Sequence, residues 1–233
     1  MQTLITEEIA HISGIPKKLV IFLHGYIDSA PSIDKKLITF LDGMQDYALH
    51  IPQAPLTCEI HENKRQWYSM HRFDPDDARK FVSTFAECLA YYDKMSPGLE
   101  EAYAYLGDYV DQCLNDYGLE EKDLYLCGFS QGAMLALYTA LRREKKIAGC
   151  ISFSGILAGG PYILEHYHST PEFLLIHGDC DNLVRYEALQ HTASTLQNIG
   201  CKVRTLTVGG GKHMVTDEGL AAAGAFIAGT LQK

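Results

Sequence analysis

The sequence predicts an α/β fold with a mainly parallel, doubly wound sheet and helices on both faces. Apolar runs of strand length alternate along the chain with segments in which apolar residues recur at helical spacing, the pattern of successive βα units. Several of the runs end in glycine, as expected where a strand buried on both faces passes into a loop. Hydrophobic residues make up 47% of the 233 residues, and no Pro- or Ser-rich linker divides the chain. We therefore expect a single domain over residues 1–233.

The first predicted strand is the near-continuous apolar run 17–25, which ends in His24-Gly25. Ligands bind beyond the carboxyl ends of parallel strands, so the loop that follows this strand is expected to face the site. Apolar residues at helical spacing predict a helix over 31–41, and a short strand is expected over 47–51 before Pro52.

A polar segment leads to Arg65 and is followed by the aromatic pair Trp67-Tyr68. Such a pair can line an acyl pocket, but it more often anchors a loop on the core, and we favour the anchor. Helices are predicted over 76–95 and 98–117, with Ser96-Pro97-Gly98 separating them. The segment 73–97 is interpreted either as a partial cover over the site or, slightly preferred, as part of a surface helix pair.

The stretch Gly128-Phe129-Ser130-Gln131-Gly132 stands where an apolar run, 124–127, gives way to a helix-forming run, 133–137. A G-x-S-x-G turn between strand and helix holds the serine side chain clear of the backbone, where a base can activate it. The two glycines allow close approach of neighbouring segments while Ser130 takes strained dihedral angles. The context therefore indicates a nucleophile elbow rather than an ordinary βα loop.

Two further buried strands, over 149–155 and 173–178, are expected after the elbow, followed by a helix (186–199), a strand (202–208) and a closing helix (217–231). In this type of fold the acid and then the histidine follow the serine along the chain. Asp179 and Asp181 come directly after one strand and His213 directly after the next. Periodicity alone leaves open which of the two acids holds His213.

Charge and composition exclude several classes of function. The net charge of −9, with scattered basic residues, argues against nucleic acid as a partner. The N-terminal residues do not resemble a signal peptide, and no apolar stretch approaches the roughly eighteen residues of a transmembrane segment. Seven cysteines without a CxxC pair favour a reducing compartment, so we expect a cytoplasmic protein.

Neither a metal nor a cofactor is expected. The histidines outside the candidate site, His50 and His61 among them, show no metal-ligand spacing, and His24 is interpreted as structural. The run Gly209-Gly210-Gly211 lacks the patterns of nucleotide-binding loops.

The chain resembles the acyl-protein thioesterase and lysophospholipase-like carboxylesterase family of α/β-hydrolases. Six blocks carry the resemblance, in family order and over most of the chain: Phe22-Leu23-His24-Gly25, Pro52-Gln53-Ala54-Pro55, Trp67-Tyr68, Gly128 to Ala133, His177-Gly178-Asp179-Cys180-Asp181 and the glycine-led His213. The resemblance implies that Ser130 is the nucleophile, His213 the general base and then acid, and Asp181 the orienting carboxylate. It also implies an oxyanion hole made by the backbone N–H groups of Tyr26 and Gln131.

The chain departs from the family pattern at three places. A tyrosine and Ile27-Asp28 stand where the family usually has leucine and a Gly-Asp pair, which alters the pocket and leaves the backbone donor available. The segment 182–185 lacks the usual proline, and Lys212 replaces a small residue.

The resemblance implies a serine hydrolase that cleaves carboxylic esters or thioesters through an acyl-enzyme on Ser130. Acyl esters, lysophospholipids and S-acyl groups, including those of acylated proteins, all fit as substrates. One alternative keeps the triad but transfers the acyl group to an alcohol or thiol, which product analysis with competing acceptors would detect. Another is a non-catalytic binding protein on the same fold, which would not react with a fluorophosphonate probe at Ser130.

Overall fold

A seven-stranded sheet forms the centre of the computed structural model, which describes residues 5, 7–37, 40–41, 44–75 and 83–231. Its strands lie in the order β1-β3-β2-β6-β7-β8-β9. All neighbours pair in parallel except β1, which runs antiparallel to β3. The bounds are β1 Glu8–Ser13, β2 Lys18–Leu23, β3 Tyr47–Pro52, β6 Leu124–Phe129, β7 Gly149–Phe153, β8 Glu172–Gly178 and β9 Lys202–Val208.

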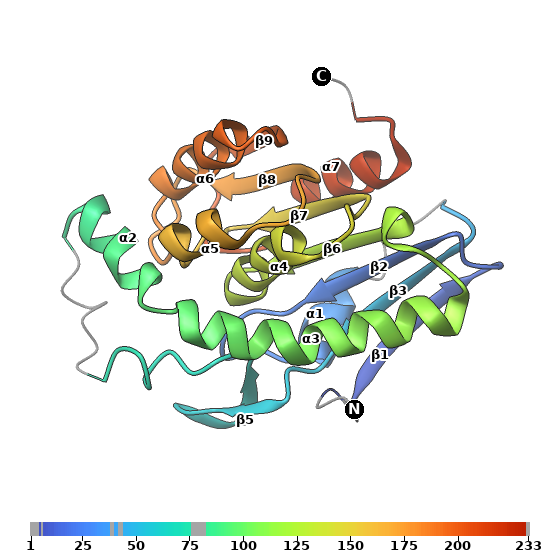
Figure 1. Cartoon of the computed structure of the whole chain (residues 1–233), viewed down its shortest axis with the longest axis horizontal. Helices are drawn as coiled ribbons and strands as arrows, with labels where there is room; N and C mark the ends of the chain where they lie inside the picture. Colours follow the sequence, from blue (N-terminus) through green and yellow to red (C-terminus); the bar gives the residue numbers. More distant parts are fainter. Residues whose placement is uncertain (1–4, 6, 38–39, 42–43, 76–82, 232–233) are drawn as a thin grey trace.

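Helices cover both faces of the sheet (Figure 1). One face carries α2 (Phe85–Asp93), α3 (Ser96–Tyr117), α4 (Gln131–Arg142), α5 (Gly160–His166) and α6 (Glu187–Asn198). The other face carries α1 (Ala30–Leu37) and α7 (Asp217–Ala228). A 3₁₀ turn, η2 (Glu121–Asp123), precedes β6. The predicted α/β class, with a mainly parallel sheet and helices on both sides, is therefore confirmed.

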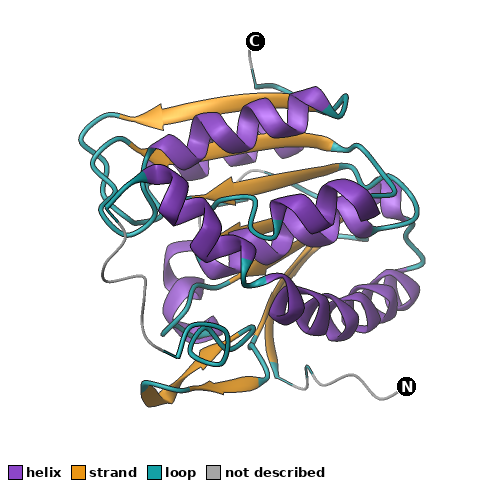
Figure 2. Cartoon of the chain, turned by 60° about the vertical axis from the view of Figure 1, so that its left-hand side comes forward, coloured by secondary structure: helices purple, strands orange, loops and turns teal. Residues whose placement is uncertain are grey.

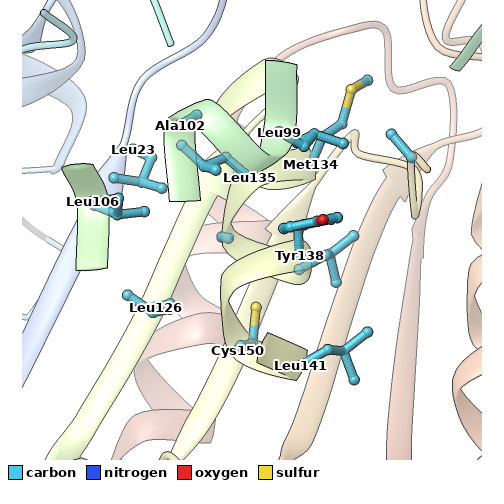
Figure 3. Close-up of a cluster of buried hydrophobic side chains, with 14 of the residues drawn as sticks. Leu23, Leu99, Ala102, Leu106, Leu126, Met134, Leu135, Tyr138, Leu141 and Cys150 are labelled. Atoms are coloured by element: carbon cyan, nitrogen blue, oxygen red, sulfur yellow. The ribbon is translucent and has the colours of Figure 1, made fainter. Parts of the chain in front are cut away.

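The sheet separates two apolar clusters, because side chains along a strand point alternately to its two faces. Leu19 and Ile21 of β2 enter the cluster under α3 and α4, whereas Val20 and Phe22 enter the cluster under α1 and α7. Figure 3 shows the first cluster where α3 and α4 meet the sheet. Every described residue from Gln131 to Leu141 is buried, so α4 is enclosed by protein on all sides and its N-terminus is held rigidly.

A two-stranded hairpin lies apart from the main sheet (Figure 2). It consists of β4 (Leu56–Cys58) and β5 (His61–Gln66). Arg65 of β5 donates its backbone N–H to the carbonyl oxygen of Asp28, at 3.0 Å. This contact places the hairpin beside the loop that follows β2.

Most predicted elements are present, with corrections at their ends. The helix expected over 76–95 is not continuous, since Ser83 and Thr84 are not helical and α2 begins at Phe85, where Thr84 and Glu87 form a reciprocal capping box. Residues 76–82 lie outside the described part. Ser96-Pro97-Gly98 does not separate two helices but forms the first turn of α3, in which proline needs no hydrogen-bond acceptor. The closing helix ends at Ala228 because Gly229 takes a left-handed conformation, with φ of 73°.

Further differences concern α1 and elements that were not predicted, among them the 3₁₀ turn η2. The first helix ends at Leu37; residues 38–39 lie outside the description, and Phe40-Leu41 is a turn. The sequence interpretation missed β1, the hairpin strands and α5. β5 is made entirely of polar residues, so it shows no apolar alternation, and β1 was not recognised although its exposure alternates along the strand.

Candidate active site

Ser130 lies on a strained turn between β6 and α4. Its backbone angles are φ 53° and ψ −117°, a combination rare for any residue with a side chain. The turn is possible because Gly128 and Gly132 approach closely: a Cβ on Gly128 would lie 2.4 Å from the carbonyl carbon of Gly132. The backbone N–H of Ser130 donates to the carbonyl oxygen of Phe153 on the neighbouring strand, at 3.0 Å. The nucleophile-elbow geometry expected from the sequence is present.

Three side chains from three loops form one hydrogen-bonded chain. The Oγ atom of Ser130 is 2.9 Å from Nε2 of His213, and Nδ1 of His213 is 2.7 Å from Oδ2 of Asp181. Each residue follows a different strand, β6, β9 and β8 respectively, and all three reach the carboxyl edge of the sheet. The structure thus brings together the serine, histidine and acid that the sequence singled out.

Asp181, rather than Asp179, contacts the imidazole. Oδ1 of Asp181 accepts the backbone N–H groups of Leu183 and Val184, both at 2.9 Å, which leaves Oδ2 to face His213. Asp179 instead accepts the backbone N–H of Gly210 at 2.7 Å and so joins the loops after β8 and β9.

The Asp181 side chain is fully buried and ionised. Burial by itself raises its pKa, but hydrogen bonds from His177 and His213 outweigh that effect and hold the pKa well below its usual value. His177, to which the sequence interpretation gave no role, lies with Nε2 3.3 Å from Oδ2 of Asp181 and 2.9 Å from the carbonyl oxygen of Val184. The only sequence signal for this contact was the position of His177 at the end of a buried strand, four residues before the acid.

The loops after β8 and β9 pack against each other through glycine. A Cβ on Gly178 would lie 2.2 Å from the carbonyl oxygen of Gly211, and the N–H of Cys180 donates to that same oxygen at 2.9 Å. Only a residue without a side chain allows this approach, which places Asp181 within reach of His213.

The predicted oxyanion donors lie on two elements next to Ser130. Gln131 is the first residue of α4, where backbone N–H groups have no acceptor within the helix. Tyr26 follows Gly25, and a Cβ built on Gly25 would lie 3.6 Å from Cβ of Ser130. Both residues therefore stand at the serine.

A buried histidine fixes the backbone of this second loop. Nδ1 of His24 is 2.8 Å from the carbonyl oxygen of Gly25, and its Nε2 accepts the N–H of Ala54 at 3.1 Å. Burial lowers the pKa of His24 to about 4, even though its bond to Gly25 acts in the opposite direction. His24 is thus neutral, with its proton on Nδ1, and it holds the Gly25–Tyr26 peptide in one orientation.

Trp67 acts as an anchor. Its side chain is completely buried, its indole N–H donates to the carbonyl oxygen of His24 at 2.8 Å, and its backbone N–H donates to Oε1 of Gln131 at 2.8 Å. The amide nitrogen of Gln131 in turn donates to the carbonyl oxygen of Tyr68, at 2.9 Å. The segment after the hairpin is therefore fastened to both elements that carry the predicted oxyanion donors.

The segment 73–97 is partly core. In its described part, Cys88, Tyr91 and Tyr92 of α2 are buried in the cluster that also holds Trp67. Arg185, in the loop after β8, donates to the carbonyl oxygen of Ser83 at 3.0 Å. The start of α2 thus lies beside the loop that carries Asp181.

One group of possible metal ligands lies elsewhere, where α3 packs on β1 and β3. Ligand atoms of Glu8, His50 and Cys113 fall within 4.8 Å of one another. Nδ1 of His50 is 2.7 Å from the Glu8 carboxylate and 3.0 Å from the Tyr109 hydroxyl, so hydrogen bonds already link these groups. Sequence spacing did not suggest the cluster because its members come from three separate elements.

The site and the fold together define a class of protein. Among mostly parallel α/β folds, the α/β-hydrolases carry a serine on a strained strand-to-helix turn, with the acid and the histidine following it in the order found here. The chain matches, over residues 5–231, the model of the family described as Phospholipase/Carboxylesterase. It belongs to that family of enzymes.

Individual relatives agree with this assignment. Acyl-protein thioesterase 1 of Neurospora crassa is 26% identical over 224 residues, which cover 92% of this chain and 87% of the relative. A probable carboxylesterase of Oryza sativa subsp. japonica is 26% identical over 212 residues, covering 88% and 74%. The crystal structure of esterase PE8 superposes with a TM-score of 0.82 at 29% identity and covers 97% of this chain and 98% of that one. The crystal structure of Arabidopsis thaliana SOBER1, at 21% identity and a TM-score of 0.74, shares the fold.

Within the described residues, no helix is both long enough and apolar enough to cross a membrane.

Proposed function

We propose that the chain is a serine hydrolase that cleaves carboxylic esters or thioesters through an acyl-enzyme on Ser130. The observation that carries this proposal is the hydrogen-bonded chain from Ser130 through His213 to Asp181 on a strained elbow, in a chain of this family. One relative is named a probable carboxylesterase and another an acyl-protein thioesterase, which supports both esters and thioesters as substrates.

In the first step, Nε2 of His213 takes the proton of Ser130 as its Oγ attacks the carbonyl carbon. Asp181 accepts a hydrogen bond from Nδ1–H of His213, which keeps Nε2 unprotonated beforehand and stabilises the imidazolium afterwards. The negative oxygen of the tetrahedral intermediate is stabilised by the backbone N–H groups of Tyr26 and Gln131. His24 holds the peptide that carries the first of these donors.

The intermediate then collapses to the acyl-enzyme. His213 gives its proton to the departing alcohol or thiol, next accepts a proton from water, and water attacks the acyl carbon. The acid leaves, Ser130 recovers its proton, and the site returns to its starting state.

The proposal extends to the kind of substrate and the compartment. Acyl esters, lysophospholipids and S-acyl groups of proteins all present a carbonyl of the required type, and product analysis with competing acceptors separates hydrolysis from acyl transfer. All seven cysteines are free thiols, six of them buried, which supports a reducing, cytoplasmic location.

Labelling by a fluorophosphonate probe tests the nucleophile directly. We expect wild-type protein to be labelled and Ser130→Ala to be folded but unlabelled, with esterase activity lower by several orders of magnitude. Ser194→Ala, on the surface helix α6, is the matched control and is expected to behave as wild type. A panel of p-nitrophenyl esters of increasing chain length, beside a long-chain acyl thioester, measures the preferred acyl group. Near-wild-type activity in Ser130→Ala would exclude the assignment.

A further inference from the structure

A cavity of about 70 Å³ lies on one side of the candidate site, between the loop after β2, the hairpin turn and α2. Its lining is unusual for a site that receives a fatty acyl chain. Tyr26, Tyr91 and Met70 contribute aromatic and thioether surface, while Glu59, Asp74 and His71 contribute polar groups. Because one water molecule needs roughly 10 to 15 Å³, the cavity can hold a compact group of several heavy atoms.

The position of the cavity indicates which part of a substrate would enter it. In the sheet, β2 lies on one side of β6 and the strands β7, β8 and β9 lie on the other. His213, which follows β9, reaches Ser130 from the second side, so a leaving group that takes its proton must also lie there. The acyl part then extends to the β2 side. Tyr26 lies on the β2 side of Ser130, and its Cα atom is about 3.8 Å from that of Gly25, the preceding residue.

Besides the buried Asp74, the cavity is lined by the carboxyl group of Glu59, an exposed residue. Its Oε1 accepts the backbone N–H groups of Met70 at 3.0 Å and His71 at 2.6 Å, and its Oε2 accepts the side-chain amide of Gln66 at 2.7 Å. Partial burial opposes ionisation, but the hydrogen bonds from His71, Gln66, Ser69 and Met70 together outweigh it and lower the pKa of Glu59. The Glu59 side chain is therefore a carboxylate at neutral pH.

The donors to this carboxylate, which include the Tyr26 hydroxyl at 3.4 Å, are neutral groups, and within the described part of the chain no ion pair to Glu59 is formed. Arg72, next along the chain from His71, turns away and pairs with Glu101 at 2.9 Å. The net charge of −9 further favours the approach of cations. A carboxylate beside tyrosine rings and a methionine is the combination that binds alkylated ammonium groups.

We propose that this cavity binds a cationic group, ammonium or trimethylammonium, carried by the acyl part of the substrate. The inference rests on the proposed function, since Ser130 remains the nucleophile and the chemistry is unchanged. It replaces a purely apolar acyl chain with an acyl group whose far end is positively charged.

Two isosteric esters with the same leaving group test the proposal. The cationic substrate is p-nitrophenyl 4-(trimethylammonio)butanoate, and its neutral counterpart is p-nitrophenyl 5,5-dimethylhexanoate. After correction for spontaneous hydrolysis, we expect wild-type kcat/KM to be about tenfold higher for the cationic ester, the scale of a partly desolvated cation–π and carboxylate contact. Glu59→Gln and, separately, Tyr91→Leu are expected to lower this ratio towards one. Glu101→Gln, which removes an exposed carboxylate outside the cavity, is expected to retain the wild-type ratio.

Each outcome decides between the two proposals. A wild-type ratio at or below one, with both esters cleaved in a Ser130-dependent manner, overturns the cationic cavity and leaves the proposed hydrolase intact. A high ratio that survives in both cavity variants also overturns it. If the wild-type protein cleaves neither ester and does not react with a fluorophosphonate, the proposed function fails and this inference fails with it. The wild-type ratio remains decisive even if a variant does not fold.

Discussion

His24 should make the stability of this protein unusually sensitive to mild acid. The imidazole is buried, with a native pKa of about 4, compared with 6.5 for an ordinary histidine. As the pH falls below 6.5 the unfolded chain takes up a proton at this position before the native protein does. The free energy of unfolding therefore has its full value above pH 6.5 and decreases as the pH falls towards 4. These two values correspond to a loss of about 2 kcal/mol between pH 7 and pH 5 and about 3 kcal/mol by pH 4.

Replacing His24 with Asn removes this titration. The amide can still donate to the Gly25 carbonyl, but the buried N–H of Ala54 loses its acceptor, so we expect a cost of about 1 to 3 kcal/mol at pH 7. Urea denaturation at pH 7 and pH 5 measures both effects. The free energy of unfolding of the variant should fall by about 2 kcal/mol less than that of wild type between the two pH values.

The carboxylates that also titrate in this range are common to both proteins and cancel in the comparison. His61→Asn, at an exposed position on β5, is the control and should follow the wild-type pH dependence. If His24→Asn and wild type lose stability in parallel, then His24 is not held neutral by burial, and the account of the loop it orders is wrong.

Three further predictions concern the candidate site. Asp181→Asn should leave the protein folded but favour the wrong tautomer of His213, which lowers kcat by up to roughly 10⁴. Asp179→Asn loses a hydrogen bond to a loop backbone and should mainly lower the free energy of unfolding. Steady-state kinetics and urea denaturation distinguish the two variants, and the reverse pattern would make Asp179 the orienting acid. Because His213 must be neutral to accept the proton of Ser130, kcat/KM should fall as the pH is lowered; a flat profile from pH 5 to 8, with chemistry limiting, contradicts the role. Gly128→Ala should place a methyl group against the backbone of the elbow. We expect it to lower the free energy of unfolding by about 1 to 3 kcal/mol or more, to lower Tm by several degrees and to reduce fluorophosphonate labelling. An unchanged Tm and labelling rate would show that the elbow tolerates a side chain.

Local patterns were sufficient to predict the elbow and the central strands. The strands β2, β6, β7 and β8 are buried on both faces, so they read as continuous apolar runs. The position of Ser130 follows from glycine spacing, because the strained turn requires small neighbours on each side of it. The positions of acid and histidine candidates followed from the ends of the next strands, although the choice of Asp181 relied on family resemblance.

Other features depended on contacts between distant parts of the chain. β5 consists of polar residues and is a strand only because β4 pairs with it and because its Arg65 bonds to the loop after β2. The contact of His177 with Asp181 depends on the path of the loop after β8, which is set by its packing on Gly211.

The α/β class, the positions of the buried strands along the chain and the elbow that carries Ser130 could therefore be predicted from the sequence. Burial and turn chemistry are local properties, since each residue's polarity or lack of a side chain constrains the backbone where it stands. Tertiary contacts were needed to show that Asp181 faces His213, how His24 and Trp67 fasten the loop at Tyr26, and that carboxyl and aromatic groups meet in one cavity beside it. Those arrangements join segments far apart in the chain, and they are selected by packing and by the need of buried polar groups for partners.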